Sequence, residues 1–426
     1  MHIPDGYLSP STCAVMYGAA APFWYLSVQR LQKTLTTRLV PLISIMSAFC
    51  FVIMMFNLPL PGGTTGHAVG MGLAAIVLGP WGSILAISIA LILQALLFGD
   101  GGILSIGANC FNMAIVGSLV AYGVYRLLAG RAALNAPRRV IAGALAGYIA
   151  INVAAFLAAV EFGIQPLLFT DPSGVPLYSF YPLSVAIPAM MLGHLTFAGL
   201  AEGVITGGVV AYLQRADPAL LRLSAPRDLG ETVTATPAGK RASWKPLVIG
   251  LVILALLSPL GLLASGTAWG EWGSNEVGAE QIGFHLRSLS ETNRTALAGE
   301  LTRLGGTTAD PDSARELRAA GELLVSNNQV GATTSLDTQL EALRAADKSQ
   351  YPQIATLTAS VNEPNGLKQW SSFWTAPIPH YAPGFLKSTI AGYIISAVIG
   401  IAVVVGFAAL IGRLLVRRRR LTGSES

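Results

Sequence analysis

The sequence is poor in charge. Asp, Glu, Lys and Arg make up 12% of its 426 residues, whereas an average soluble domain has about 25%. Apolar residues reach 53%, and the mean hydropathy is +0.58. Cysteine is also scarce: Cys13, Cys50 and Cys110 lie in or beside apolar runs, and none forms a CxxC pair. Together these features indicate an integral membrane protein with three buried free thiols and give no support to disulfides or a thiolate metal site.

Motifs for nucleotide binding and hydrolysis are absent. There is no GxxxxGK[ST], so ATP-driven transport would need an ATPase on another chain. There is also no HExxH or GxSxG, which leaves an intramembrane hydrolase without support. We therefore do not expect an enzyme.

Basic residues are missing from the N-terminal stretch MHIPDGYLSP. The first basic side chain after His2 is that of Arg30, whereas a secretory signal peptide opens with positive charge. We expect Met1 to be the mature terminus, because the bulky His2 disfavours removal of the initiator methionine. We then expect Met1 and His2 to be the functional part of this stretch, and Asp5 and Gly6 to shape the turn that follows.

Nine stretches have the apolar content expected of membrane spans, which need about 20 such residues each. The third and fourth are short and meet near Pro80, so they are either a hairpin or a broken pair. The nine spans are 11–29, 40–57, 67–80, 82–98, 108–128, 138–160, 184–213, 246–265 and 388–412.

Lys and Arg gather after the first, fifth, seventh and ninth of these spans. The loops 58–66, 99–107 and 161–183 contain neither residue. Because basic loops stay in the cytoplasm, the N-terminus is expected outside and the C-terminus inside. The net charge of +5 then reflects membrane orientation, not nucleic-acid binding.

The pattern divides the chain into a seven-span block (1–215), a polar cytoplasmic linker (216–243) and a two-span region (244–426). The long loop of that last region, 266–386, is expected outside. Leucine and alanine recur there at helical spacing, which predicts a small helical subdomain. Its expected helices are 290–304, 313–325 and 336–347.

Two of the five histidines are candidate metal ligands. His67 lies in PGGTTGHAVG at the outer mouth of the third span, on the same side as the N-terminus. The Met1 amine, the His2 backbone nitrogen and the nearer His2 ring nitrogen can chelate one ion in fused five- and six-membered rings. A nitrogen from His67 would complete a planar set, which suits Ni(II) or Cu(II), with Co(II) as an alternative. Taken singly, His2 is an ordinary second residue and His67 a helix-capping histidine.

Other polar residues are candidates for supporting or gating this site. Asp100 lies in the exterior turn FGDGG, and Asn109 and Asn112 enter the fifth span. His194 and Glu202 lie inside the seventh span, where ionisable groups are costly and point to function. Their spacing of eight places them about 80° apart around a helix, and structural hydrogen bonds between helices are the alternative for both.

Five segments together resemble one family: MHIPDGYLSP, PGGTTGHAVG, QALLFGDGG, GANCFNMAIVG and GHLTFAGLAEGVITGG. They are similar to the CbiM/NikM family, the substrate-binding (S) components of energy-coupling-factor (ECF) cobalt and nickel transporters. The similarity covers the seven-span block, about half of the chain. Residues 244–426 resemble the small two-helix partner CbiN/NikN, through SPLGLLASGTAWGEWG and PGFLKSTIAGYIISAVIG.

The resemblance implies an all-α membrane protein, with a seven-helix S-component bundle and two further spans flanking an exterior helical domain. It implies metal ligands at Met1, His2 and His67. It also implies a transmembrane coupling (T) component and ATP-binding (A) subunits as partners, the NikN-like partner being fused in cis. No permanently bound cofactor is expected.

The function expected from the resemblance is capture of Ni(II) or Co(II) outside the cell membrane by an ATP-driven importer, for cobalamin synthesis or nickel enzymes. A membrane metal sensor and an uncoupled secondary permease are the alternatives. The residues do not choose between nickel and cobalt, because both metals accept these ligands.

Overall fold

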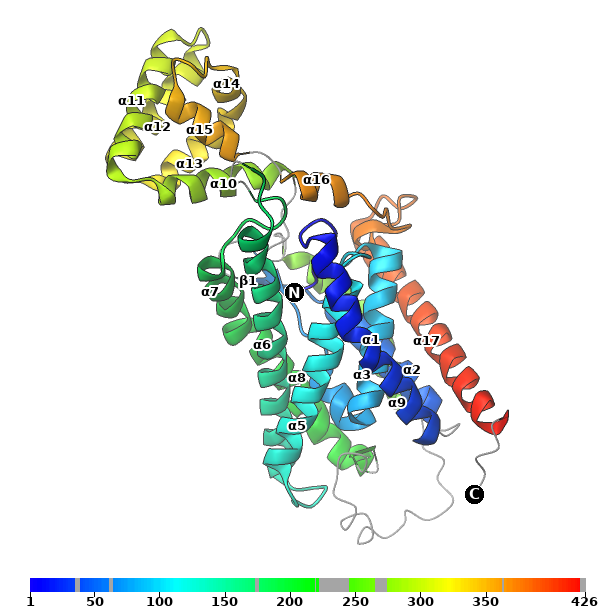
Figure 1. Cartoon of the computed structure of the whole chain (residues 1–426). Helices are drawn as coiled ribbons and strands as arrows, with labels where there is room; N and C mark the ends of the chain where they lie inside the picture. Colours follow the sequence, from blue (N-terminus) through cyan, green and yellow to red (C-terminus); the bar gives the residue numbers. More distant parts are fainter. Residues whose placement is uncertain are drawn as a thin grey trace. The chain divides into compact units, whose positions relative to one another are not determined.

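The computed structural model is almost entirely helical (Figure 1). It describes residues 1–34, 39–60, 64–172, 176–218, 220–221, 245–264, 274–361 and 364–421. Two compact units emerge. The membrane unit comprises Met1–Phe169, Tyr178–Gly270 and Gln369–Ser426, and the helical unit comprises Thr170–Leu177 and Glu271–Lys368.

Helices and one short hairpin build the membrane unit. The hairpin pairs β1 (Leu58–Leu60) with β2 (Thr64–Gly66) in antiparallel register. The helical elements are α1 (Pro10–Thr34), α2 (Leu39–Met54), α3 (Met71–Phe98), α4 (Ile106–Asn109), the π-helix η1 (Cys110–Val116), α5 (Gly117–Ala129), α6 (Pro137–Leu168), α7 (Leu183–Gly193), the π-helix η2 (His194–Ala198), α8 (Gly199–Ala216), α9 (Lys245–Leu257), the 3-10 helices η5 (Ser258–Leu263) and η6 (Pro379–Tyr381), and α17 (Thr389–Leu421).

A helical element overlaps each of the nine predicted spans. Within the described residues, five helical stretches have the length and hydropathy of a membrane span. They are Met71–Phe98, Ile106–Ala129, Pro137–Leu168, Leu183–Ala216 and Thr389–Arg417, and Leu39–Met54 and Val248–Leu263 are shorter apolar helices. The expectation of an all-α membrane protein is confirmed. Most of the linker predicted at 216–243 lies outside the described residues.

Helix α3 doubles back at Gly79. The backbone there has φ 71° and ψ 171°, outside the helical region and open mainly to glycine. His67 lies just before α3 and Asp100 just after it, yet both lie against the His2 ring. A straight helix of 28 residues would separate its ends by about 42 Å. The two spans predicted on either side of Pro80 are therefore the arms of a helical hairpin.

Small residues let three helices approach closely. A Cβ atom on Gly72 of α3 would lie 2.6 Å from the Thr206 hydroxyl of α8 and 2.8 Å from the Gly147 Cα of α6. Such contacts are typical of helix packing in membranes, where van der Waals contact replaces the hydrophobic effect. The three cysteines are buried and free, as predicted.

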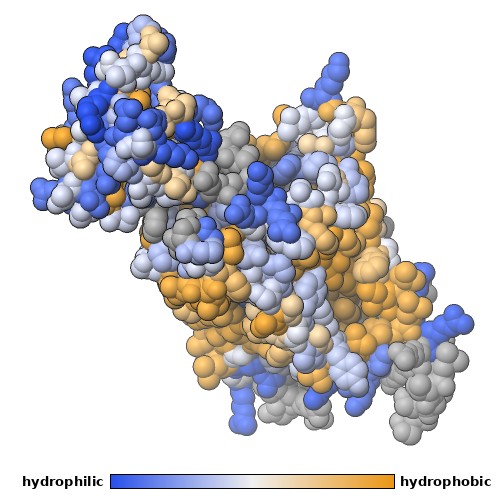
Figure 2. Space-filling model, turned by 45° about the horizontal axis from the view of Figure 1, so that its top comes forward, coloured by the Kyte–Doolittle hydropathy of each residue, from blue (hydrophilic) through white to orange (hydrophobic). Residues whose placement is uncertain are grey.

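The outer faces of the membrane unit carry exposed apolar side chains. Figure 2 shows broad hydrophobic areas on this unit. Such a surface fits contact with lipid better than with water. Its members include Val15, Leu127, Phe156, Leu192, Leu200, Leu256 and Phe407.

The C-terminal helix belongs to the same unit as the first seven spans. Helix α17 packs against α2, and α9 also contacts α2. The Tyr393 hydroxyl donates to the Met55 carbonyl oxygen at 3.0 Å. Gly400 lies directly on the ring of Phe51 and leaves no space for a Cβ atom. These contacts join the C-terminal region to the bundle that contains the N-terminus.

The helical unit consists of short helices around a core of leucine, isoleucine and alanine. The helices predicted at 290–304 and 313–325 are present, whereas the single helix predicted at 336–347 is wrong. The helix is interrupted at Gln339, between α13 and α14. The side chains of Thr338 and Gln339 there donate to the Glu316 carboxylate. The helices are α10 (Ser274–Ser288), α11 (Glu291–Thr307), α12 (Pro311–Val325), α13 (Gln329–Thr338), α14 (Leu340–Ala345), α15 (Pro352–Ser360) and α16 (Asn365–Trp370), the last of which ends in the membrane unit.

Candidate metal centre

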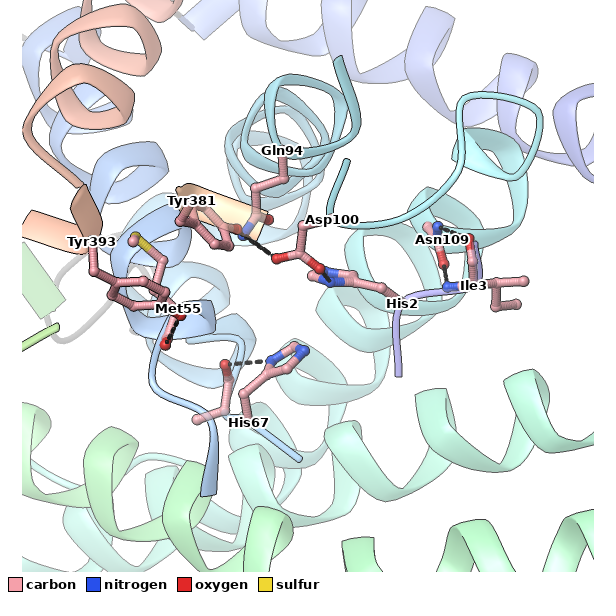
Figure 3. Close-up of polar contacts among 10 residues, drawn as sticks. His2, Ile3, Met55, His67, Gln94, Asp100, Asn109, Tyr381 and Tyr393 are labelled. Atoms are coloured by element: carbon pink, nitrogen blue, oxygen red, sulfur yellow. Dashed lines mark hydrogen bonds and ion pairs between the residues drawn. The ribbon is translucent and has the colours of Figure 1, made fainter. Parts of the chain in front are cut away.

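The N-terminal segment is folded into the bundle. Met1 and His2 are each only 3% exposed. The Ile3 amide donates to the Asn109 side-chain oxygen at 2.8 Å, and the Asn109 side-chain amide donates to the Ile3 carbonyl oxygen at 3.0 Å (Figure 3). Gly102 N–H donates to the same carbonyl oxygen at 2.9 Å. The first residues are thus fixed by backbone hydrogen bonds to the α3–α4 loop and α4.

Asp5 fixes the turn that follows. Its two carboxylate oxygens accept from the amides of Ile103 and Leu104 at 3.0 and 2.8 Å. Burial raises the pKa of Asp5, and these hydrogen bonds oppose the shift. Gly6 next to it has φ +88°, a value that glycine adopts without strain. The turn therefore has the two residues at its bend that the sequence suggested.

His67 presents one ring nitrogen as a lone-pair donor. Its Nδ1 lies 3.1 Å from the Ala68 carbonyl oxygen. When Nδ1–H donates there, Nε2 carries the lone pair of the neutral ring. Burial lowers the pKa of His67 well below its usual value, and the nearby His2 and Met1 amino group lower it further. The ring centroids of His2 and His67 are 4.8 Å apart, so two imidazoles meet in a buried site.

Glu202 of α8 holds the loop that carries His67. Its carboxylate accepts from the amides of Val69 and Gly70, each at 2.8 Å, and from Gly72 at 3.0 Å. Glu202 is fully buried. A helix N-terminus leaves its first amides without partners in the helix and carries partial positive charge. A carboxylate there satisfies both requirements and fixes the start of α3, four residues after His67.

Asp100 lies between His2 and Tyr381 (Figure 3). The His2 Nδ1 is 2.5 Å from one carboxylate oxygen, and the Tyr381 hydroxyl donates to the other at 2.5 Å. Gln94 donates to that second oxygen at 3.3 Å and to the Tyr381 hydroxyl at 3.0 Å. Burial alone would raise the pKa of Asp100, but His2 and the hydrogen bonds hold it below its usual range. The ring nitrogen expected to chelate metal thus contacts a carboxylate.

Comparison with known proteins identifies the family. The family model described as CbiM, cobalt uptake substrate-specific transmembrane region, matches residues 2–220. The chain belongs to the CbiM family. The fused nickel transport protein NikMN of Rhodobacter capsulatus is 44% identical over 420 residues, 99% of each chain. The probable fused nickel transport protein LarMN of Lactiplantibacillus plantarum is 44% identical over 279 residues, 65% of this chain and 79% of that protein.

Two solved structures are also similar to this CbiM-family chain. A transition metal transporter shares 52% identity and covers 53% of the chain, with a TM-score of 0.49. A truncated transition metal transporter shares 54% identity and covers 50% of the chain, with a TM-score of 0.47. The full-length similarity to the fused relative supports a NikN-like part in cis. Named transport proteins among the relatives are consistent with a transporter component rather than an enzyme.

Two of the predicted residues of this CbiM-family chain have other partners. Asn112 donates to Glu161 of α6 at 2.9 Å. His194 lies at the start of η2, where its Nδ1 is 2.8 Å from the Met190 carbonyl oxygen of the preceding turn. Within the part of the chain that the structure describes, the buried Nε2 of His194 has no hydrogen-bond partner. Asp100, Asn109 and Glu202, by contrast, contact the segments that carry His2 and His67.

Gln94 and Tyr381 were not predicted as parts of the site. Gln94 stands inside the segment QALLFGDGG, six residues before Asp100, on an apolar helix. Tyr381 is 281 residues from Asp100, and its short Pro-rich surroundings give no pattern that points to a partner. Among the described residues, no group of three or more His, Cys, Asp and Glu side chains is arranged to hold a metal. The expected set of four nitrogens would not form such a group, because two of them, the Met1 amine and the His2 backbone nitrogen, belong to the main chain.

Proposed function

We propose that this chain is the substrate-capture component of an ATP-driven ECF-type importer and binds Ni(II) or Co(II) at its N-terminus. The observation that carries the proposal is the buried convergence of Met1, His2 and His67. All three residues are at most 6% exposed, and the two imidazoles lie 4.8 Å apart. Relatives named as nickel and cobalt transport proteins support the choice of cargo.

The proposed ligands are four nitrogens. The Met1 amine and the His2 backbone nitrogen, which must release its proton to solvent, would close a five-membered chelate ring with the ion, and the His2 Nδ1 would close a six-membered ring. The Nε2 of His67 completes the set. Planar nitrogen coordination suits Ni(II), and Co(II) is the alternative, because affinity order alone does not decide selectivity.

Loading requires the His2 ring to change partners. Its Nδ1 lies on Asp100 in this structure, so the ion takes the place of the proton shared with that carboxylate. The carboxylate stays beside the bound cation, where its negative charge stabilises the complex. Asp100 therefore supports the site in both states.

The proposed orientation has the N-terminus outside and the C-terminus in the cytoplasm. It rests on the Lys and Arg clusters that follow alternate spans. Energy would come from separate ATP-binding subunits through a transmembrane coupling component. The two-helix region 244–426 would act in cis as the NikN-like partner.

Metal binding to the purified full-length chain tests the ligand set. We expect His2→Ala, His67→Ala and extension of the N-terminus by one residue each to weaken Ni(II) binding about 100-fold or more, because each removes or displaces a ligand. His285→Ala is the matched control, since it removes an imidazole in the helical unit. Unchanged affinity in the His2 and N-terminal variants would sink the proposal. Competition between Ni(II) and Co(II) assigns the preferred cargo.

Uptake in cells tests the transport role. Metal accumulation should require co-expression of the ATP-binding and coupling subunits. Uptake that follows an ion gradient and ignores the ATPase would indicate a secondary permease. High-affinity binding without uptake in any combination would indicate a sensor.

A further inference from the structure

A segment from the C-terminal region lies on the metal centre. We call residues 369–388, between the helical unit and α17, the return segment. The Trp374 indole N–H donates to the Leu96 carbonyl oxygen at 3.0 Å, and the Ile378 amide donates to that of Leu97 at 2.9 Å. These carbonyl groups belong to the last turn of α3, where the helix itself supplies no partner. The return segment therefore binds the helix end that leads into Asp100.

Tyr381 is the residue of this segment whose side chain bonds Asp100. Its ring stacks on Phe98 at 4.7 Å, and its own carbonyl oxygen accepts from the Ser396 hydroxyl of α17 at 2.9 Å. The side chain is 6% exposed. Tyr381 and His380 both have positive φ, 59° and 52°. Non-glycine residues keep this conformation only where the surroundings hold it, and such positions concentrate at functional sites.

We propose that Tyr381 is a positioning residue of the metal centre, which holds Asp100 in place while His2 passes from the carboxylate to the metal ion. This inference rests on the proposed function. The C-terminal region is then more than a neighbour of the bundle. It supplies a side chain that sets how tightly the N-terminal site retains its cargo.

The hydrogen bonds explain why the hydroxyl matters. Before loading, Asp100 has His2 on one oxygen and Tyr381 on the other, with a weaker contact from Gln94. When metal takes His2, the first partner is lost. The Tyr381 hydroxyl then remains as the strong donor to a carboxylate whose side chain is only 24% exposed. Without it, loading would leave a largely buried carboxylate poorly satisfied, which is costly.

The test measures Ni(II) affinity and dissociation rate for full-length variants. Tyr381→Phe keeps the ring and the stack on Phe98 but removes the hydroxyl, so we expect about tenfold weaker binding and faster release. The visible absorption band of bound Ni(II) should stay in place, because the ligand set is unchanged. Tyr393→Phe is the matched control: it removes a hydroxyl from the adjacent ring, 5.4 Å away, which bonds Met55 instead.

A double-mutant cycle separates positioning from general destabilisation. In an Asp100→Asn background, Tyr381→Phe should change the affinity by less than about twofold, because the charge that the hydroxyl serves is gone. Wild-type affinity in Tyr381→Phe, equal losses in both tyrosine variants, or an undiminished effect of Tyr381→Phe in the Asp100→Asn background would each overturn the inference. If His2→Ala also keeps full affinity, the proposed function fails as well. If His2→Ala loses affinity and Tyr381→Phe does not, only the role of Tyr381 fails.

Discussion

Ile3 and Asn109 form a reciprocal pair of hydrogen bonds. The Ile3 amide donates to Oδ1 of Asn109 at 2.8 Å, and Nδ2 of Asn109 donates back to the Ile3 carbonyl oxygen at 3.0 Å. The Asn109 side chain thus pairs with both backbone groups of Ile3, as a neighbouring strand would in a sheet. Because Ile3 follows His2 directly, this pair fixes the position of the N-terminus inside the bundle.

Substitutions of Asn109 should weaken metal binding in a graded way. Asn109→Asp keeps an acceptor for the Ile3 amide but loses the donor and places negative charge near a carbonyl oxygen. Asn109→Ala loses both hydrogen bonds. Each bond contributes about 1 kcal/mol, so we expect about fivefold weaker Ni(II) binding in Asn109→Asp and about thirtyfold weaker binding in Asn109→Ala. Isothermal titration of the purified chain measures it, and wild-type affinity in both variants would refute a positioning role for Asn109.

Glu202→Gln should disturb the His67 loop. The amide retains one acceptor oxygen and turns an NH₂ group toward backbone amides that previously donated to a carboxylate. We expect a loss of about 2–3 kcal/mol in stability, since buried donors lose their partner, together with weaker Ni(II) binding. Thermal unfolding in detergent and metal titration provide the two measurements.

Glu161→Gln is the control for that substitution. Glu161 is also buried in a membrane helix, but its carboxylate accepts from the Asn112 side chain instead of from the backbone amides that follow His67. We expect its metal affinity to stay within about twofold of wild type. If the two glutamine variants lose affinity equally, the cause is a general loosening of the bundle. The hydrogen bonds of Glu202 would then not be what holds His67 in position.

Local patterns in the sequence were sufficient for the membrane helices, and they singled out His2 and His67, whose ring centroids lie 4.8 Å apart in the structure. Apolar runs of membrane length predicted the spans. They did not decide whether the third and fourth spans, which meet near Pro80, form a hairpin or a broken pair. What decides that question is a tertiary relation: both ends of α3 lie against His2. The same limit applies to Tyr381, since its hydrogen bond to Asp100 joins residues 281 positions apart. No periodicity encodes such a pairing.

The N-terminus of α12 in the helical unit should respond to pH. Asp310 caps this helix, and its carboxylate accepts from the Ser313 amide at 2.9 Å. Hydrogen bonds from Ser313 hold the pKa of Asp310 below its usual value. A carboxyl group whose pKa is lower in the folded state stabilises that state fully at pH values above its unfolded-state pKa. This contribution is lost as the pH falls through the folded-state pKa.

Hydrogen exchange at the start of α12 checks this expectation. Protection, corrected for intrinsic rates, should fall in the wild type as the pH drops from above the unfolded-state pKa of Asp310 through its lowered folded-state pKa. In Asp310→Asn it should fall less, because asparagine caps without charge. Asp312→Asn is the control, since Asp312 lies in the same turn but beyond the cap. Identical pH profiles for wild type and Asp310→Asn would rule out the charged cap as the cause.

Gly72 stands where three helices meet, so Gly72→Ala should destabilise the bundle. The added methyl would lie 2.6 Å from the Thr206 hydroxyl and 2.8 Å from the Gly147 Cα atom. The hydroxyl can rotate away, but the backbone of α6 cannot, and overpacking of this kind costs about 1–3 kcal/mol. Gly208→Ala on α8 is the control, because no described residue lies within 4 Å of its added Cβ atom. Thermal unfolding in detergent should separate the two variants. Equal stability would mean that α3 shifts freely against α6, and then the first turn of α3 could not hold the His67 loop rigidly against Glu202.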